Sequence, residues 1–236
     1  MKLAIMQPYV FPYIGYWQLM NEVDAFIFYD NVNFIKKGYV NRNSILINGL
    51  ANKFTIPLIN ASQNRLINEI EIDYSQKWSQ KLLNSIFLTY KKALNFEETY
   101  LLLTRILNEN YRTISELNVN SSIEIAKKLK IKTAFLIASE LDYKTDLKGE
   151  DKILKYCELK GAVHYINPVG GVDIYDEAKF ESKRIKLSFL KTNPTSYKQL
   201  GKQAFVDNLS IIDVLMNNSF EDVCEMLSQF ELKSKS

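Results

Sequence analysis

The chain has 236 residues, 47% of them hydrophobic, which is enough to bury one sizeable core. Its 30 basic and 27 acidic residues give a net charge of only +3, and their interleaving along the chain argues against DNA as a partner. Two distant cysteines and one histidine provide neither a disulfide framework nor a soft-ligand metal site. We therefore expect no bound metal.

The N-terminal apolar run, residues 2–6, stops at Gln7 and Pro8 and is too short for a signal peptide. No other run is long enough to span a bilayer. We expect a cytoplasmic protein without membrane insertion. It should fold as a single domain over residues 1–230, followed by a disordered tail over residues 231–236. Its oligomeric state stays open.

The chain opens with the pattern of a βαβ unit. Residues 2–6 predict a strand, and a loop rich in proline and tyrosine follows. The helical spacing of apolar residues over 17–23 then predicts a helix, and residues 25–29 predict a second strand.

The later elements alternate in type. A hairpin is expected over about residues 33–58, because two extended runs flank the turn Asn48-Gly49. A helical block follows over about residues 74–130. Further strands are expected at 133–138, 163–166 and 185–190, with helices at 150–159, 211–216 and 220–227. The alternation predicts an α/β fold: a mainly parallel Rossmann-like sheet of about five strands flanked by helices, with an inserted hairpin and a helical block.

Polar residues follow the first two strands at their carboxyl ends. Gln7 and Tyr9 come after the first strand, and Asp30 and Asn31 come after the second. Ligands of open α/β sheets bind beyond these ends. We therefore expect these side chains to face one crevice and to bind substrate.

A later strand ends in Asn167 and is followed by Gly170 and Gly171. Paired glycines let the backbone approach a ligand closely, and the N–H groups of a helix beginning near Asp173 could meet an anion. The alternative interpretation is a turn in which one glycine needs a positive φ.

The segment from Asn31 to Asn43 mixes basic and aromatic residues. Lys36, Lys37 and Arg42 could grip a diphosphate while Phe34 or Tyr39 stacks on a base, which would suit a nucleotide-linked substrate. Two alternatives stay open: Arg42 could hold Asp30 in a salt bridge, and the lysines could protect a solvated hairpin edge.

Asp30 and His164 are the candidates for a general base. His164 is the only histidine, but the alternation of its strand also fits a hydrogen-bonded core histidine. Asp30 ends a buried strand beside the crevice. No Ser-His-Asp spacing or nucleophile elbow is present, so we do not expect covalent catalysis.

Three stretches carry a resemblance to a known family: the opening MQPYVFPYIGYWQ with the later run GYVNRN, the segment YINPVGG followed by Tyr175, and LSIIDVLMNN over residues 209–218. Over nearly its full length, the chain resembles the WbqC-like family of bacterial proteins. The resemblance implies a role in surface polysaccharide (O-antigen, lipopolysaccharide) biosynthesis, with nucleotide-activated amino sugars as substrates. Carried over to this sequence, the family's motifs point to Gln7, Tyr9, Asp30, Lys37, Arg42, Asn43, Asn167, Gly170 and Gly171.

A second likeness concerns the run Pro12-Tyr13-Ile14-Gly15-Tyr16. It is similar to the His-x-Gly-His turn of Rossmann-like nucleotidyltransferases, with tyrosines in place of the histidines. The likeness implies the same kind of fold and a substrate-binding place for Tyr16. A tyrosine donates a hydrogen bond but carries no positive charge, so the chemistry of those enzymes does not carry over with it.

The family resemblance implies transfer of an acyl or aminoacyl group, such as glycyl, to the amine of a nucleotide-linked amino sugar. Such a reaction needs a base, Asp30 or His164, and a donor to the carbonyl oxygen, Asn43 or Gln7. No tightly bound cofactor is expected. The acyl donor would be a co-substrate: a carrier-protein thioester, an aminoacyl-tRNA or a free activated amino acid. The alternatives are nucleotidyl transfer to a sugar phosphate and a noncatalytic nucleotide-sugar binding or scaffold protein.

Overall fold

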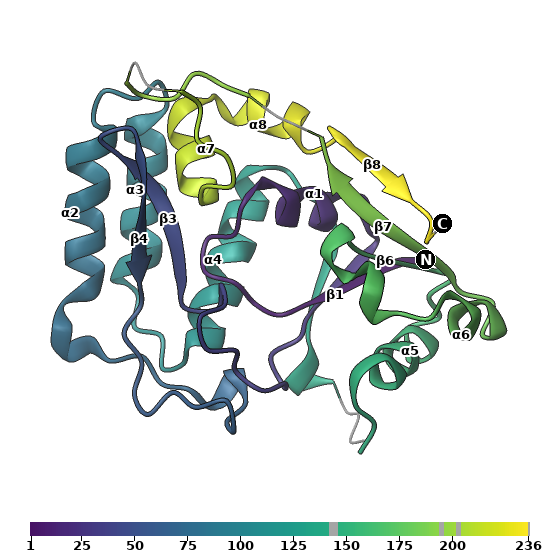
Figure 1. Cartoon of the computed structure of the whole chain (residues 1–236). Coiled ribbons are helices and arrows are strands. Elements are labelled where there is room, and N and C mark those ends of the chain that lie inside the picture. The colour runs from purple at the N-terminus through teal and green to yellow at the C-terminus, as the bar shows by residue number, and fades with distance from the viewer. Residues whose placement is uncertain (142–145, 194–195, 202–203, 236) are drawn as a thin grey trace.

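The computed structural model describes residues 1–141, 146–193, 196–201 and 204–235. Its main element is a six-stranded sheet with the order β5-β2-β1-β6-β7-β8 (Figure 1). The strands span Lys2–Met6 (β1), Ala25–Phe28 (β2), Ala134–Ile137 (β5), His164–Pro168 (β6), Lys186–Thr192 (β7) and Phe230–Lys233 (β8). Neighbours from β5 to β7 are parallel, and β8 is antiparallel to β7. The predicted α/β class with a mainly parallel sheet is confirmed.

Strand β8 corrects the expectation of a disordered tail. Phe230 pairs with Thr192 and Lys233 pairs with Phe189, so residues 231–233 are ordered at the edge of the sheet. The outer edge of β7 offers N–H and C=O groups that a further strand can pair with. A four-residue strand depends on that partner rather than on its own apolar pattern, which is why the sequence gives so weak a signal. Ser236 lies outside the described residues.

The strand order changes direction at β1. Strands β2 and β5 lie on one side of β1, and β6 and β7 lie on the other. The loops that leave the carboxyl ends of β1 and β6 therefore diverge, and ligands of open α/β sheets bind at such a switch point. Residues 7–13, here called the first loop, follow β1, and a 3-10 helix over Val169–Ile174 follows β6.

Helices cover both faces of the sheet. On one face, α5 (Gly149–Leu159) and α6 (Glu177–Ser182) pack with Leu3, Ile5 and Tyr165 (Figure 1). On the other face lie α1 (Ile14–Glu22), α4 (Ile114–Lys128), α7 (Ile211–Asn217) and α8 (Phe220–Met226). Successive strand residues alternate between the two cores, as the pleat of a strand requires.

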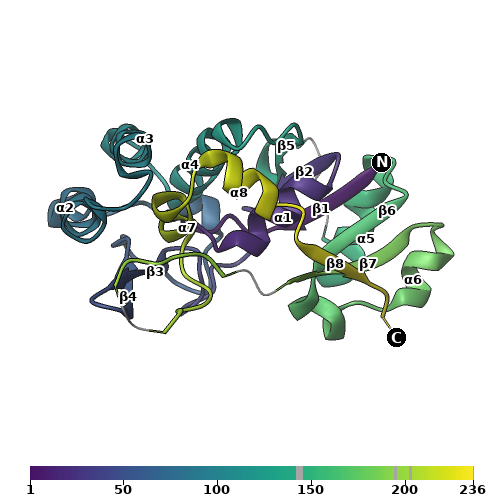
Figure 2. The ribbon, with the colours of Figure 1, turned by 90° about the horizontal axis from the view of Figure 1, so that it is seen from above.

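The hairpin and the remaining helices form a block beside the sheet. Strands β3 (Arg42–Ile47) and β4 (Leu50–Thr55) are antiparallel, and Asn48 and Gly49 turn between them with φ values of 52° and 77°. Positive φ at both positions is typical of a two-residue hairpin turn. Helices α2 (Trp78–Tyr90) and α3 (Phe96–Asn108) complete the block. Helix α4 lies between these two helices and the sheet (Figure 2). The predicted hairpin and helical block are both confirmed.

Buried polar side chains hold the carbonyl groups of the first loop. The Asn118 amide of α4 donates to the Pro8 carbonyl at 2.9 Å and to the Val40 carbonyl at 2.7 Å. The Asn43 amide of β3 donates to the carbonyls of Val10 and Phe11 at 3.0 and 2.7 Å. A buried carbonyl without a donor is costly, so these amides fix the path of the loop.

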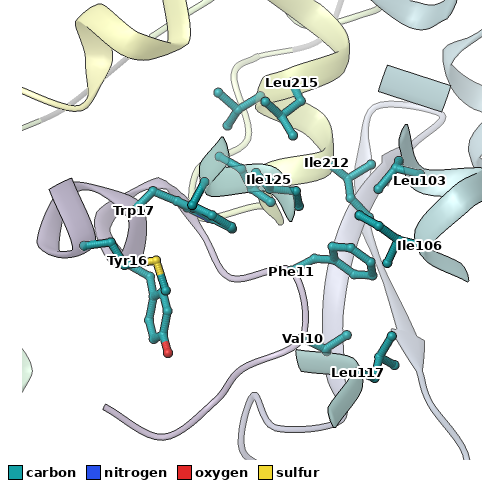
Figure 3. Packing of buried hydrophobic residues seen from close by; sticks show 14 of the residues in the cluster. Val10, Phe11, Tyr16, Trp17, Leu103, Ile106, Leu117, Ile125, Ile212 and Leu215 are labelled. Carbon is teal, nitrogen blue, oxygen red and sulfur yellow. The ribbon is translucent and has the colours of Figure 1, made fainter. Parts of the chain in front are cut away.

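Phe11 anchors the first loop in the core. Its φ of 42° lies in the left-handed region, which a bulky residue seldom adopts. The side chain is 1% exposed and lies among Leu103, Ile106 and Ile212 (Figure 3). Ser210, at the start of α7, also donates its hydroxyl to the Phe11 carbonyl at 2.8 Å. Burial and hydrogen bonding together offset the backbone strain.

Within the described ranges, no helix combines the length and the apolar character needed to cross a membrane.

We predict that Asn118→Ala lowers the free energy of unfolding by about 2 to 3 kcal/mol, because it leaves two buried carbonyl groups without their donor. Asn120→Ala is the matched control on the same helix, since Asn120 is exposed and bonds only within α4. Its effect should stay within about 0.5 kcal/mol. Urea denaturation followed by circular dichroism measures both. Equal effects would show that Asn118 does not hold the first loop.

Candidate functional site

Asp30 lies at the carboxyl end of β2 and is 2% exposed. Its carboxylate accepts hydrogen bonds from the Ser139 backbone N–H at 2.9 Å and from the Ser139 hydroxyl at 2.6 Å. The Ser115 hydroxyl of α4 approaches at 3.4 Å. Asp30 therefore links the ends of β2 and β5 to α4. Ser139 itself is exposed, so the hydroxyl bonded to Asp30 belongs to a surface residue.

Lys152 of α5 approaches the same strand end. Its Nζ atom lies 3.2 Å from Asn31 Oδ1 and 3.3 Å from the Asn31 carbonyl oxygen, and 4.9 Å from the centre of the Tyr29 ring. Partial burial lowers the pKa of the Lys152 ammonium, and the negative charge of Asp30 acts in the opposite direction. We call Asp30, Asn31, Ser139 and Lys152 the strand-end cluster.

Asn167 lies in a second polar network, at the carboxyl end of β6. Its side-chain amide donates to the Tyr165 hydroxyl at 2.9 Å, and the hydroxyls of Tyr165 and Tyr175 are 3.1 Å apart. Burial raises the pKa of both tyrosines, so both hydroxyls stay protonated at neutral pH. Tyr175 also contributes to the raised pKa of Tyr29, the residue before Asp30 in the sequence.

The two glycines after β6 differ in their surroundings. Neither has a positive φ, so the alternative interpretation of a turn that needs one is wrong. A Cβ atom on Gly171 would meet the side-chain oxygen of Asn167, whereas a Cβ on Gly170 would meet nothing within 4 Å. Gly171 thus makes room for the Asn167 amide, and Gly170 leaves an open approach to the end of β6.

Tyr9, Tyr16 and Tyr39 form a row of rings along the first loop. The ring of Tyr9 lies 5.7 Å from that of Tyr16 and 5.9 Å from that of Tyr39. Tyr16 is 2% exposed and donates its hydroxyl to the Gln7 carbonyl at 2.8 Å, so it supports the loop from beneath. Tyr39 is 61% exposed. Tyr9 and Tyr39 are therefore the rings of this row that a ligand can reach.

Lys37 and Arg42 flank Tyr39 in the segment that leads into the hairpin, residues 31–42. Arg42 donates from Nε to the Gly38 carbonyl at 3.0 Å and pairs with no carboxylate among the described residues. The alternative of an Arg42–Asp30 salt bridge is wrong, because Asp30 bonds to serines instead. Lys37 is exposed, with a φ of 68°. Asn43 uses its amide hydrogens on Val10 and Phe11.

The structure does not bring His164 together with Asp30. His164 is the first residue of β6 and pairs with Lys2 and Lys186, at the amino end of the sheet. Its Nε2 atom lies 2.9 Å from the Ser188 hydroxyl. Burial lowers the pKa of His164, and the charges of Lys186 and Lys2 add to the effect. His164 is thus hydrogen-bonded, as the alternative interpretation expects, but it is only partly buried.

Sequence reasoning missed Lys152 and Ser139. The helix of Lys152 was expected over residues 150–159, but the sequence does not show which side chains a single lysine of an amphipathic helix contacts in the fold. Ser139 directly follows the expected strand at 133–138, and applying the strand-end rule there would have found it. In the described part of the chain, no three His, Cys, Asp or Glu side chains gather as metal ligands.

We predict that Gly171→Ala lowers the free energy of unfolding by about 1 to 3 kcal/mol, because the new methyl group overlaps the Asn167 amide. Gly170→Ala, whose methyl group meets open space, is the control and should change stability little. Thermal and urea unfolding compare the two variants. A stable Gly171→Ala protein would contradict the packing of Asn167 described above.

We also predict that Asp30→Asn lowers the pKa of Lys152 further, because the variant removes the negative charge that favours the ammonium form. A ¹³C NMR titration of the Lys152 Cε resonance measures this change. Lys179, whose pKa is raised by Glu150 and Asp151, is the internal control and should titrate as before. An unchanged Lys152 titration would show that Asp30 and Lys152 are not electrostatically coupled.

Comparison with known proteins identifies the family of the chain. The chain matches the model of the WbqC-like protein family over residues 7–225. It is also 28% identical over 219 residues to the uncharacterized protein Rv1507c of Mycobacterium tuberculosis, with 92% of this chain and 93% of that protein covered. No solved structure matches the chain. On the family match, which takes in both the first loop and the strand-end cluster, the chain belongs to the WbqC-like protein family.

Proposed function

We propose that the protein transfers an acyl or aminoacyl group, such as glycyl, to the amine of a nucleotide-linked amino sugar, in the biosynthesis of bacterial surface polysaccharide. The observation that carries the proposal is the strand-end cluster. It combines a hydrogen-bonded carboxylate–hydroxyl pair with a partly buried lysine. Both lie at the carboxyl ends of the strands, where such folds bind ligands.

The carboxylate–hydroxyl pair supplies the base. The sugar ammonium must lose a proton before its nitrogen can attack. Asp30 is too buried to meet the sugar directly, but the exposed Ser139 donates its hydroxyl proton to Asp30 at 2.6 Å. In the proposed step Ser139 accepts the proton of the sugar amine while passing its own to Asp30.

Lys152 supplies the positive charge. As the sugar nitrogen forms a bond to the carbonyl carbon, the electron pair of the carbonyl moves onto its oxygen, and a preorganised cation stabilises that oxygen. The carbonyl then re-forms as the bond from carbon to the sulfur or oxygen of the donor breaks, and the leaving group takes the electron pair of that bond and the second proton of the sugar nitrogen. Asn31 holds the Lys152 ammonium in place through two contacts.

The segment that leads into the hairpin, residues 31–42, would bind the nucleotide. Arg42 and Lys37 would bind the diphosphate, and Tyr39, with Tyr9 beside it, offers an exposed ring for the base. Gly170 leaves the end of β6 open to the sugar. A carrier-protein thioester or an aminoacyl-tRNA would act as the acyl donor and co-substrate.

Nucleotidyl transfer to a sugar phosphate is the second candidate, favoured by one observation. The run from Pro12 to Tyr16 lies at the end of the first loop and runs into the start of α1, a place between strand and helix similar to that of the His-x-Gly-His turn in nucleotidyltransferases. Tyr16, however, donates its hydroxyl hydrogen to the Gln7 carbonyl within the loop and has no further hydrogen to offer a substrate. This observation ranks the second candidate below the first.

The test of the proposed function is a mass-spectrometric assay with a nucleotide-linked amino sugar and an acyl donor. The product should be heavier than the sugar substrate by one acyl or aminoacyl group. Release of pyrophosphate from a nucleoside triphosphate and a sugar phosphate would favour nucleotidyl transfer. Binding of the nucleotide sugar without turnover by any donor would favour a binding protein.

We predict that Lys152→Met lowers kcat by about 10²- to 10³-fold, the usual effect of removing one donor to a developing oxyanion. Lys155→Met is the control on the same helix, because Lys155 faces Glu158 and not Asn31. It should keep near wild-type activity. Nucleotide-sugar affinity should change little in either variant. A Lys152→Met enzyme with normal kcat and a raised KM would assign Lys152 to binding.

A further inference from the structure

A groove between the hairpin and α2 lies outside the strand-end cluster. It has a volume of about 220 Å³ and is open at the surface. A dry cavity of roughly 150 Å³ lined by aliphatic and aromatic side chains binds benzene, so this groove has room for a small apolar group. The apolar residues that line it come from both strands of the hairpin, the segment after them and α2: Ile45, Ile47, Phe54, Ile56, Pro57, Trp78 and Leu82.

The charges in the groove are all positive. Lys53 of β4 and Lys81 of α2 line it, and no Asp or Glu does. Neither ammonium group has a hydrogen bond or an ion pair to a described residue. Both side chains are exposed, and like charges that line one small groove repel each other, a repulsion that a bound anion would relieve. The charge therefore favours a negatively charged ligand.

Trp78 adds a hydrogen-bond donor without a partner. The residue is 6% exposed, and its indole Nε1 has no acceptor among the described residues. A buried N–H group without an acceptor is unfavourable, and a ligand in the groove that Trp78 lines could supply one. The other tryptophan, Trp17, contrasts with it, since its indole donates to the Pro12 carbonyl at 3.0 Å.

We propose that this groove is a binding site for a small amphipathic anion, a short apolar chain or ring that ends in a carboxylate. The apolar part packs on the isoleucines of β3 and on Trp78. The carboxylate pairs with Lys53 and Lys81 and offers an acceptor to the Trp78 indole. The proposal is independent of the acyl transfer proposed above.

The experiment uses octanoate as the probe and follows the two indole N–H resonances of the ¹⁵N-labelled protein by NMR. Trp78→Phe assigns the signals. The Trp78 resonance should shift in a saturable way, while that of Trp17 should not move. Octanol, which has the same chain without the charge, should bind more weakly by at least about tenfold, the effect of one charge-assisted contact.

Charge reversal tests the two lysines. The double variant Lys53→Glu/Lys81→Glu should bind octanoate more weakly by at least about tenfold. Lys92→Glu/Lys132→Glu, which changes two exposed lysines away from the groove, is the matched control and should bind as the wild type does. If the first double variant melts early, Lys53→Gln/Lys81→Gln replaces it.

Three results would overturn the proposal. The first is a Trp78 resonance that octanoate does not move, or that moves only together with Trp17, as in general unfolding by a surfactant. The second is equal affinity for octanoate and octanol. The third is undiminished binding in the folded lysine variants, which would leave the groove a plain apolar surface.

Discussion

The rest of the structure depends on how the first loop is held. The carbonyl groups of Pro8, Val10 and Phe11 accept hydrogen bonds from side chains outside the loop. Asn43 of β3, Asn118 of α4 and Ser210 of α7 provide these donors, so three elements far apart in sequence meet at one short segment. Because an unpaired buried carbonyl costs roughly 1 to 3 kcal/mol, the hairpin block cannot shift relative to the sheet without breaking several such bonds. The loop that carries Tyr9 is thereby fixed before any ligand arrives.

This support also decides what Asn43 can do. A side-chain amide has two N–H donors, and Asn43 uses its nitrogen on Val10 and Phe11, while its oxygen accepts the backbone N–H of Ser44 at 2.8 Å. Asn43 has no donor left for a substrate carbonyl. In the proposed reaction, another group must therefore stabilise the carbonyl oxygen. Lys152 is such a group: its neighbours Asn31 and Tyr29 offer it a carbonyl, an amide oxygen and a ring face, and Asp30 favours its charged form.

The sequence predicts a feature well when the residues that determine it are close together in the chain, and poorly when they are far apart. The βαβ opening, the hairpin and the helical block were predicted, because their apolar spacing and the Asn48-Gly49 turn are local patterns. The strand β8 and the role of Gly171 were not, since one depends on the free edge of β7 and the other on the Asn167 side chain. For the site, strand-end reasoning located Asp30 and Asn167. It could not locate Lys152, which reaches the cluster from a helix more than a hundred residues later. Nor could it place His164 at the opposite, amino end of the strands, because register is a property of the whole sheet.

Strand β3 connects the two regions that carry the proposals. Asn43 on this strand fixes the first loop, and Ile45 and Ile47, two and four residues further on, line the groove against α2. Residues at these spacings share one face of a strand, so a ligand in the groove presses on the same face that holds the loop. A hairpin packs as a unit, and Leu46 of the same strand is tied to Tyr90 of α2 by a hydrogen bond of 2.9 Å. A change in the spacing between β3 and α2 would therefore strain the hydrogen bonds that Asn43 makes to the carbonyls of Val10 and Phe11.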